Sequence, residues 1–138
     1  MKIEIAVERT GVPVGVITAA ANKAETELLG PVLSTIPEGV ALPIETPVIL
    51  DRSYDSDPLR DQMKEENIIL ISPHRRNRVK EATNDGRRLR RYKRRWIVER
   101  TIGWLHSFRR LTIRHEYYSF LFDGFVHLAC ALIAISRF

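Results

Sequence analysis

The segment PVILDRSYDSDPLRDQMKEENIILIS, residues 47–72, decides the fold class because two short apolar runs flank a polar stretch of helical character. The runs PVIL and IILI have the length and composition of buried strands. Between them, Asp57 can cap a helix whose first residue is Pro58. A strand, a helix and a strand in succession predict an α/β fold, in which helices cover a mixed sheet.

The residues before this segment predict a hairpin and one helix. KIEIAV alternates polar and apolar residues, ERTG is turn-like and GVPVGVIT follows, so we expect a β-hairpin over residues 2–18. Asn22 can cap the next helix, with Glu25 three positions on as a capping box requires. Pro31 should kink or divide that helix.

The residues after it predict a loop and two helices. Residues 73–91 are polar, basic and interrupted by glycine, so we expect a loop that orders only on a ligand. Helices should follow over roughly residues 92–109 and 119–136. The last is strongly apolar, but Asp123, His127 and Arg137 interrupt it, which favours a buried core helix over a membrane span. No linker or repeat divides the chain, so residues 1–138 should form a single domain.

Charge is concentrated in one part of the chain, whose net charge is +5. Residues 74–110 hold 14 Lys and Arg against 3 Asp and Glu, whereas the rest holds 8 against 14. Such a local field is typical of a protein that binds nucleic acid, although a solvated charged face is the simpler alternative. The single cysteine, Cys130, and the lack of an apolar leader at the N-terminus favour a reducing compartment.

Two further patterns carry candidate functional residues. On a helix that begins near Tyr92, four polar side chains fall within an arc of roughly 60°. They are Tyr92, Arg95, Glu99 and His106, and the opposite arc holds Ile97, Thr101, Trp104, Leu105 and Phe108. The alternative is a solvated stripe held by local ion pairs.

Asp51 has a different setting, because it ends the apolar run Val48 to Leu50. The carboxyl end of a buried strand is where open α/β sheets bind ligands, although an aspartate there can also cap a turn. Asp55 and Asp57 are interpreted as acids at a helix start.

These residues resemble those of bacterial insertion-sequence transposases with a DDE nuclease domain. YKRRWIVERTIGWLHSFRRL, residues 92–111, matches the family's pattern at Tyr92, Arg95 and Glu99, and VILDRSYDSDPLR is similar to the segment around its second catalytic aspartate, here Asp51. RTGVPVGVITAAAN resembles the hairpin that precedes it, and LACALIAI the closing helix. The likeness covers almost the whole chain in order.

The resemblance implies an RNase H-like fold with a mixed five-stranded sheet and three carboxylates that hold two divalent cations, Mg²⁺ or Mn²⁺. Asp51 and Glu99 would be the metal ligands in this chain, and Tyr92 and Arg95 would shape the site. The basic residues would hold the DNA backbone. We assign that role to Arg75, Arg76, Arg78, Lys80, Arg87, Arg88, Arg90, Arg91, Lys93, Arg94 and His106.

Three departures from the family pattern affect these expectations. His106 stands where the family has a basic residue, and it is mostly neutral at pH 7. Around the hairpin, Glu8 stands where the family often has Asp, and Ala24-Glu25 corresponds to the family's His-Asp. The first catalytic aspartate lies on a strand upstream of the hairpin, and this chain begins at the hairpin. We therefore expect an N-terminally incomplete domain, a weakly bound metal and weak or no activity of the chain alone.

Two alternatives have other functions. A nucleic-acid-binding protein without enzymatic activity would need only the basic segment 75–95. An inhibitor would pair with full-length transposase. The expected partners are DNA and either a second copy or full-length transposase, with no membrane, and the expected location is the bacterial cytoplasm, in association with the nucleoid.

Overall fold

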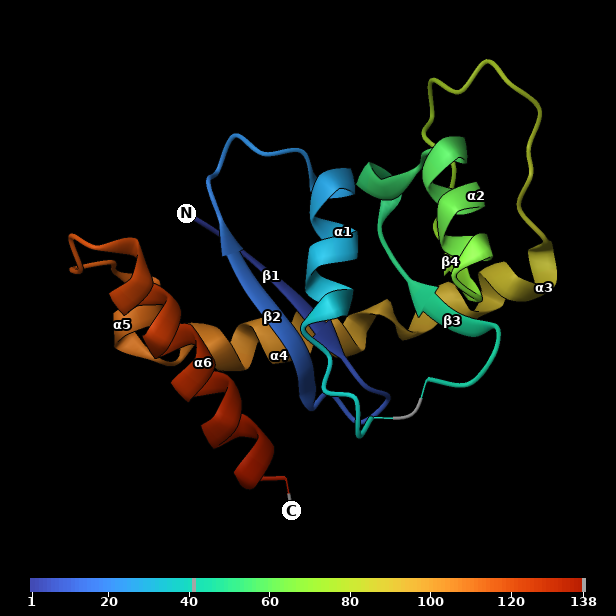
Figure 1. Ribbon diagram of the computed structural model, residues 1–138. Coiled ribbons are helices and arrows are strands. Elements are labelled where there is room, and N and C mark those ends of the chain that lie inside the picture. Colours follow the sequence, from blue (N-terminus) through green and yellow to red (C-terminus); the bar gives the residue numbers. More distant parts are fainter. Residues whose placement is uncertain (41, 138) are drawn as a thin grey trace. The chain divides into compact units, whose positions relative to one another are not determined.

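The computed structural model describes residues 1–40 and 42–137, which fold as two compact units. We call Met1–Val40 with Ile97–Phe138 the hairpin unit and Ala41–Trp96 the βαβ unit. The hairpin unit contains β1 (Lys2–Val7), β2 (Pro13–Ala19), α1 (Glu25–Ser34), α5 (Arg109–Thr112) and α6 (Ser119–Ile135), together with α4 (Trp96–His106) from its second residue on (Figure 1).

The βαβ unit contains two strands, two α-helices and two 3₁₀ helices (Figure 1). They are β3 (Thr46–Ile49), η1 (Arg52–Tyr54), α2 (Asp57–Glu65), β4 (Ile68–Ile71), α3 (Gly86–Leu89) and η2 (Arg90–Arg95). The single domain expected over residues 1–138 stays a prediction.

The predicted hairpin is confirmed. β1 and β2 pair antiparallel with Ile5 opposite Val16. In the turn, Glu8 Oε1 accepts hydrogen bonds from the backbone N–H groups of Thr10 at 2.8 Å and Val12 at 3.3 Å. Gly11 has a φ of +94°, a left-handed conformation that glycine adopts without a steric penalty.

The two faces of this hairpin carry different layers, because successive residues of a strand point to opposite faces. A Cβ on Gly15 would lie 2.8 Å from the carbonyl oxygen of Val32, so the missing side chain lets α1 approach closely. The neighbouring Val16 packs instead in a core with Leu105 of α4 and Val126 of α6. The hairpin is therefore covered by α1 on one face and by the α4 and α6 core on the other.

Helix α1 begins later than predicted and is not divided at Pro31, whereas a kink at Pro31 stays a prediction. It begins at Glu25 with Ala24 as N-cap and no side-chain cap, so the predicted cap by Asn22 is wrong. The reason is a turn closed by the Lys23 N–H on the Ala20 carbonyl at 3.1 Å, which places Asn22 before the helix. Pro31 lies inside the helix and does not divide it. The preceding Gly30 has no side chain to collide with the proline ring.

Helix α6 enters the core with one face only, so the prediction of a buried core helix holds in part. The other face is exposed and carries Phe120, Leu121, Leu128, Leu132 and Ile135. Phe122, Val126 and Ile133 are buried in the hairpin unit, and Asp123 Oδ1 accepts a hydrogen bond from Thr18 Oγ1 of β2 at 3.0 Å. Cys130 is also buried, and this burial raises the pKa of its thiol to about 11. Over residues 1–40 and 42–137, no helix has the length and apolar character needed to cross a membrane.

The βαβ unit confirms the strand–helix–strand prediction. β3 and β4 pair in parallel with Val48 opposite Leu70, and α2 packs on β4 through the fully buried Met63. The predicted cap of α2 is one residue off, because Ser56 is the N-cap and its side chain accepts from the Leu59 N–H. Among the described residues the strands form two two-stranded sheets. The single mixed sheet of an RNase H-like domain stays a prediction.

The basic segment is more regular than expected. Residues 73–85 are irregular, but α3 and η2 continue the chain in helical form from Gly86 to Arg95, so the loop predicted over residues 73–91 is too long. Asp85 starts α3 because its side chain accepts from the Arg87 N–H at 2.9 Å. The helix predicted over roughly residues 92–109 divides into η2, α4 and the start of the short α5.

Candidate active site

Asp51 lies just beyond the carboxyl end of β3, where the Leu50 N–H still bonds to the Ile71 carbonyl of β4 at 2.9 Å. Its Oδ1 accepts hydrogen bonds from the Ser53 backbone N–H at 2.8 Å and from the Ser53 hydroxyl. These bonds make Asp51 the N-cap of η1 and fix the carboxylate in one orientation. The interpretation of Asp51 as the cap of a turn is therefore confirmed. The strand that it follows is only partly buried, and a ligand site at its end stays a prediction.

Tyr92 and Arg95 lie side by side on η2, which packs against β3 in the same unit. Arg95 Nη1 donates to the Tyr92 hydroxyl at 3.0 Å, and its guanidinium carbon lies 5.9 Å from the Tyr92 ring centroid. The sequence predicted this proximity from α-helical geometry. The observed reason differs, because side chains three residues apart eclipse one another in a 3₁₀ helix.

Glu99 and His106 belong to α4 in the hairpin unit, and both are exposed. On the opposite side of the helix, Thr101 and Leu105 are buried, with 0% and 2% of their surface exposed. The predicted division of α4 into a core face and a polar face is thus confirmed. The approach of Glu99 to Asp51, which lies in the βαβ unit, stays a prediction.

Most of the predicted DNA-binding residues are exposed. They are Arg75, Arg76, Lys80, Arg87, Arg88, Arg90, Arg91, Lys93, Arg94 and His106. Arg78 differs, because it donates to both carboxylate oxygens of Asp57 at 3.1 and 3.0 Å. Contact with a phosphate would require its guanidinium to leave this pair.

Asp55 is the residue whose role the sequence did not reveal. Its side chain is only 3% exposed, and its Oδ1 accepts from Arg60 Nη1 at 2.7 Å and lies 2.9 Å from His74 Nδ1. Its Oδ2 accepts the Arg75 backbone N–H at 2.7 Å. Burial alone raises the pKa of Asp55, but the bonds from Arg75, His74 and Arg60 outweigh it and hold that pKa well below its usual range. The expectation that Asp55 acts as a helix-start acid is wrong, whereas Asp57 does lie in the first turn of α2.

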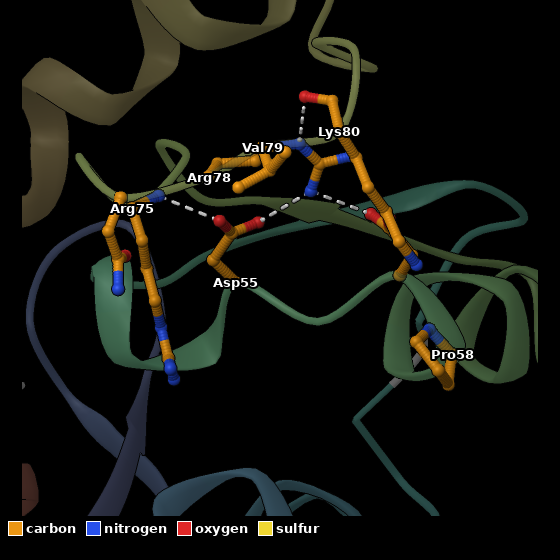
Figure 2. A pocket seen from close by; sticks show the side chains of 8 residues that line it. Asp55, Pro58, Arg75, Arg78, Val79 and Lys80 are labelled. Carbon is orange, nitrogen blue, oxygen red and sulfur yellow. Dashed lines mark hydrogen bonds and ion pairs between the residues drawn. The ribbon is translucent and has the colours of Figure 1, made fainter.

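The same network orders the start of the basic loop, and Figure 2 shows the part of it around Asp55, Arg75 and Arg78. His74 Nε2 accepts the Thr83 N–H at 3.0 Å, so the ring proton is on Nδ1 and points to Asp55. In Figure 2, Asp55 lies between Arg75 and Arg78, whose Nη1 is 3.6 Å from Oδ1 of Asp55. These hydrogen bonds hold the loop in place without a ligand, whereas the sequence predicts that it becomes ordered only when a ligand binds. A cavity of about 350 Å³ lies beside them, lined by Asp55, Asp57, Pro58, Arg75, Asn77, Arg78, Val79 and Lys80.

Arg75 links this network to Asp51. Its backbone is held by Asp55, and its side chain donates to the carbonyl oxygens of Arg52 at 3.3 Å and Ser53 at 2.7 Å. Ser53 in turn donates to Asp51. A chain of hydrogen bonds thus runs from a buried carboxylate to the exposed end of β3.

The chemistry available to this arrangement is the handling of phosphate esters. A carboxylate at a strand end provides the hard oxygen ligand that Mg²⁺ and Mn²⁺ prefer. Exposed arginines provide charge for a polyanion. Within residues 1–40 and 42–137, the structure contains no group of three or more His, Cys, Asp or Glu side chains placed to share a metal ion.

The fold and these residues define an α/β protein with a strongly basic segment. The family model for the transposase DDE domain matches residues 1–134, and the chain belongs to this family. The resemblance to insertion-sequence transposases is therefore confirmed.

Two relatives support the assignment. A predicted transposase for insertion sequence element IS402 from Burkholderia cepacia is 36% identical over 137 residues, 96% of this chain. A predicted transposase for insertion sequence element IS6501 from Brucella ovis is 38% identical over 90 residues, 62% of this chain. The matches span 61% and 65% of the lengths of these relatives. No solved structure matches the chain significantly.

Proposed function

We propose that this chain supplies part of a transposase site that cleaves and joins DNA phosphodiesters, with Asp51 and Glu99 as ligands of a divalent cation. The setting of Asp51 carries the proposal. Ser53 holds its Oδ1, and among the described residues its Oδ2 accepts no hydrogen bond, so that oxygen is available to a cation. Bound Mg²⁺ or Mn²⁺ would activate a water or a 3′-hydroxyl and stabilise the leaving oxygen of the phosphodiester.

The chain's own residues then bind and orient the DNA. Arg95 donates to the oxygen of the Tyr92 hydroxyl, which leaves the Tyr92 proton for a phosphate oxygen. The exposed cations from Arg87 to Arg94 contact the backbone and give affinity without sequence readout. With these two carboxylates as its assigned protein ligands, the cation should be weakly bound.

Metal binding tests the two ligands directly. We expect electron paramagnetic resonance titration with Mn²⁺ to show weak binding, reduced more than about 10-fold by Asp51→Ala or Glu99→Ala, since even an outer-shell change has an effect of about that size. Asp61→Ala and Glu65→Ala, which remove exposed carboxylates of α2, are the matched controls. Equal Mn²⁺ affinity in all four variants would refute the ligand assignment.

A nicking assay on supercoiled plasmid with MgCl₂ tests the reaction. Any nicking by the chain should disappear in the variant that carries both Asp51→Ala and Glu99→Ala. Nicking that persists in this variant would exclude these carboxylates from the reaction.

The exposed charge of residues 87–94 also supports the alternative of a nucleic-acid-binding protein without enzymatic activity. That function predicts DNA binding that falls with salt, by about 0.9 in the logarithmic slope per phosphate contacted. It also predicts indifference to Mg²⁺ and to Glu99→Gln. If Mg²⁺ strengthens DNA binding in the wild type and not in Glu99→Gln, the proposed metal site is favoured instead. The inhibitor that pairs with full-length transposase stays a prediction.

A further inference from the structure

Three exposed aromatic side chains lie in the hairpin unit, two just before α6 and one in its first turn. Tyr117, Tyr118 and Phe120 are 88%, 57% and 67% exposed. The Tyr117 and Tyr118 rings meet edge to face at 5.2 Å, and the Tyr118 and Phe120 rings stack at 5.5 Å with an interplanar angle of 28°. We call these three residues the aromatic step. Adjacent exposed aromatic rings indicate a binding surface, because soluble proteins rarely leave a contiguous apolar patch in contact with water.

The backbone that carries the step is fixed by arginines. Arg110 Nη1 donates to Glu116 at 2.9 Å, and the Glu116 side chain is only 5% exposed. Arg114 donates to the carbonyl oxygens of Glu116 at 3.0 Å and Tyr117 at 3.3 Å. Both guanidinium groups also lie over rings of α6, that of Arg110 at 5.4 Å from Phe125. The step is therefore held in place before any ligand arrives.

A cationic cavity belongs to the same surface region. Its volume is about 370 Å³, and it is lined by Arg109, Arg110 and His115. The one acid of residues 109–120, Glu116, is paired with Arg110, and the exposed side chain of Arg109 makes no hydrogen bond or ion pair among the described residues. The cavity thus offers uncompensated positive charge beside exposed rings.

We propose that the aromatic step and this cavity bind single-stranded nucleic acid, with unpaired bases stacked on the rings and a phosphate beside Arg109 and His115. Base stacking on aromatic side chains tolerates any sequence but requires bases that are free of a duplex. The positive charge around the rings favours a polyanion over an apolar protein segment. The choice of DNA over RNA rests on the proposed function, whereas the mode of binding does not.

Fluorescence anisotropy of the full chain in EDTA tests this site separately from the metal ligands. The probes are a labelled 15-nucleotide oligo-dT, the corresponding oligo-rU and a blunt duplex. Tyr118→Ala should weaken oligo-dT binding by at least about fivefold, the loss expected for one stacked base, with little change for the duplex. Tyr118→Phe keeps a ring and should bind as the wild type does. Ile135→Ala, which truncates an exposed side chain of α6, is the control.

The phosphate part has its own measurement. Arg109→Gln should reduce the logarithmic salt slope for oligo-dT by about 0.7, the value for one phosphate of a single strand. Asp51→Ala with Glu99→Ala should leave oligo-dT binding unchanged, so failure of the metal assignment does not affect this test. Tighter binding of oligo-rU than of oligo-dT would overturn the choice of DNA.

Three other results would overturn the site. One is oligo-dT affinity within twofold of wild type in a folded variant that carries both Tyr117→Ala and Tyr118→Ala. Another is an equal loss of duplex binding in that variant. The third is a wild-type dimer by size-exclusion chromatography that becomes a monomer in that variant, because the rings would then join two copies of the chain.

Discussion

Replacement of Asp55 by asparagine removes one negative charge from the most buried ionic cluster of the βαβ unit. The carboxylate accepts from Arg60, His74 and the Arg75 N–H, and its side chain is 3% exposed. Asparagine has nearly the same shape, but its amide NH₂ would face a donor at one of the two oxygen positions. We therefore expect Asp55→Asn to destabilise the βαβ unit without a change in its fold.

The magnitude follows from the partners. Removal of one member of a buried ion pair costs about 3–5 kcal/mol, because the other charge remains buried and uncompensated. Arg60 retains Asp57 at 3.3 Å, and asparagine retains one acceptor oxygen, so we expect the lower end, about 3 kcal/mol. This corresponds to an increase of about 100-fold in the opening constant.

Amide hydrogen exchange of β4 measures this opening, since Ile68–Ile71 lie in the core of the unit. Asp61→Asn is the matched control, because it makes the same change of charge on the exposed side of α2. We expect β4 exchange to accelerate about 100-fold in Asp55→Asn and less than about threefold in the control. Equal acceleration in both variants would refute the role of Asp55 as the centre of the cluster.

Three further predictions concern acid, the turn and Arg75. The pKa of Asp55 is lower in the folded protein than its unfolded value of about 3.9, so the stabilisation by its carboxylate is fully present above that value and is lost as the pH falls toward the folded pKa. The free energy of unfolding of the wild type, measured with urea, should therefore fall below about pH 4. In Asp55→Asn this fall should be shallower. Gly11→Ala should lower the melting temperature of the hairpin unit by several degrees, because the left-handed φ costs a non-glycine residue about 1–2 kcal/mol and the new Cβ would lie 2.8 Å from Arg100 Nη2. The control Gly124→Ala, in open space on α6, should raise the melting temperature. A fall in both variants would contradict the argument. Arg75→Gln should weaken Mn²⁺ binding by about 10-fold, because the turn that holds Asp51 loses its bond to the Arg75 side chain. The control Arg76→Gln, at an exposed neighbour, should leave the Mn²⁺ affinity unchanged. Equal affinities of both variants in the electron paramagnetic resonance titration would show that Arg75 has no role at the metal site.

The strands were predictable because their signal is local. KIEIAV alternates with period two, and PVIL and IILI are short apolar runs, so each pattern is complete within a few residues. Helix starts were less predictable, since several capping residues compete. Ser56 and Asp57 can both cap α2, and only the backbone conformation selects Ser56.

The candidate site was predictable only in part. Tyr92 and Arg95 are three residues apart and meet in any helix. Asp55 instead bonds to partners that lie 5 to 20 residues away in the sequence, in α2 and in an irregular loop. No periodic sequence pattern predicts such a cluster. An approach of Asp51 to Glu99, which stays a prediction, would likewise depend on long-range folding.

The discontinuous make-up of the hairpin unit has a consequence for biosynthesis. Thr18 and Asp123 are bonded although 105 residues separate them, and Val16 packs against α6. When translation has passed residue 96, all of the βαβ unit has been synthesised, whereas β1 and β2 still lack α4 and α6. Ile3, Ile5 and Val16 therefore stay uncovered until α6 has been synthesised, and the nascent chain exposes apolar surface until then.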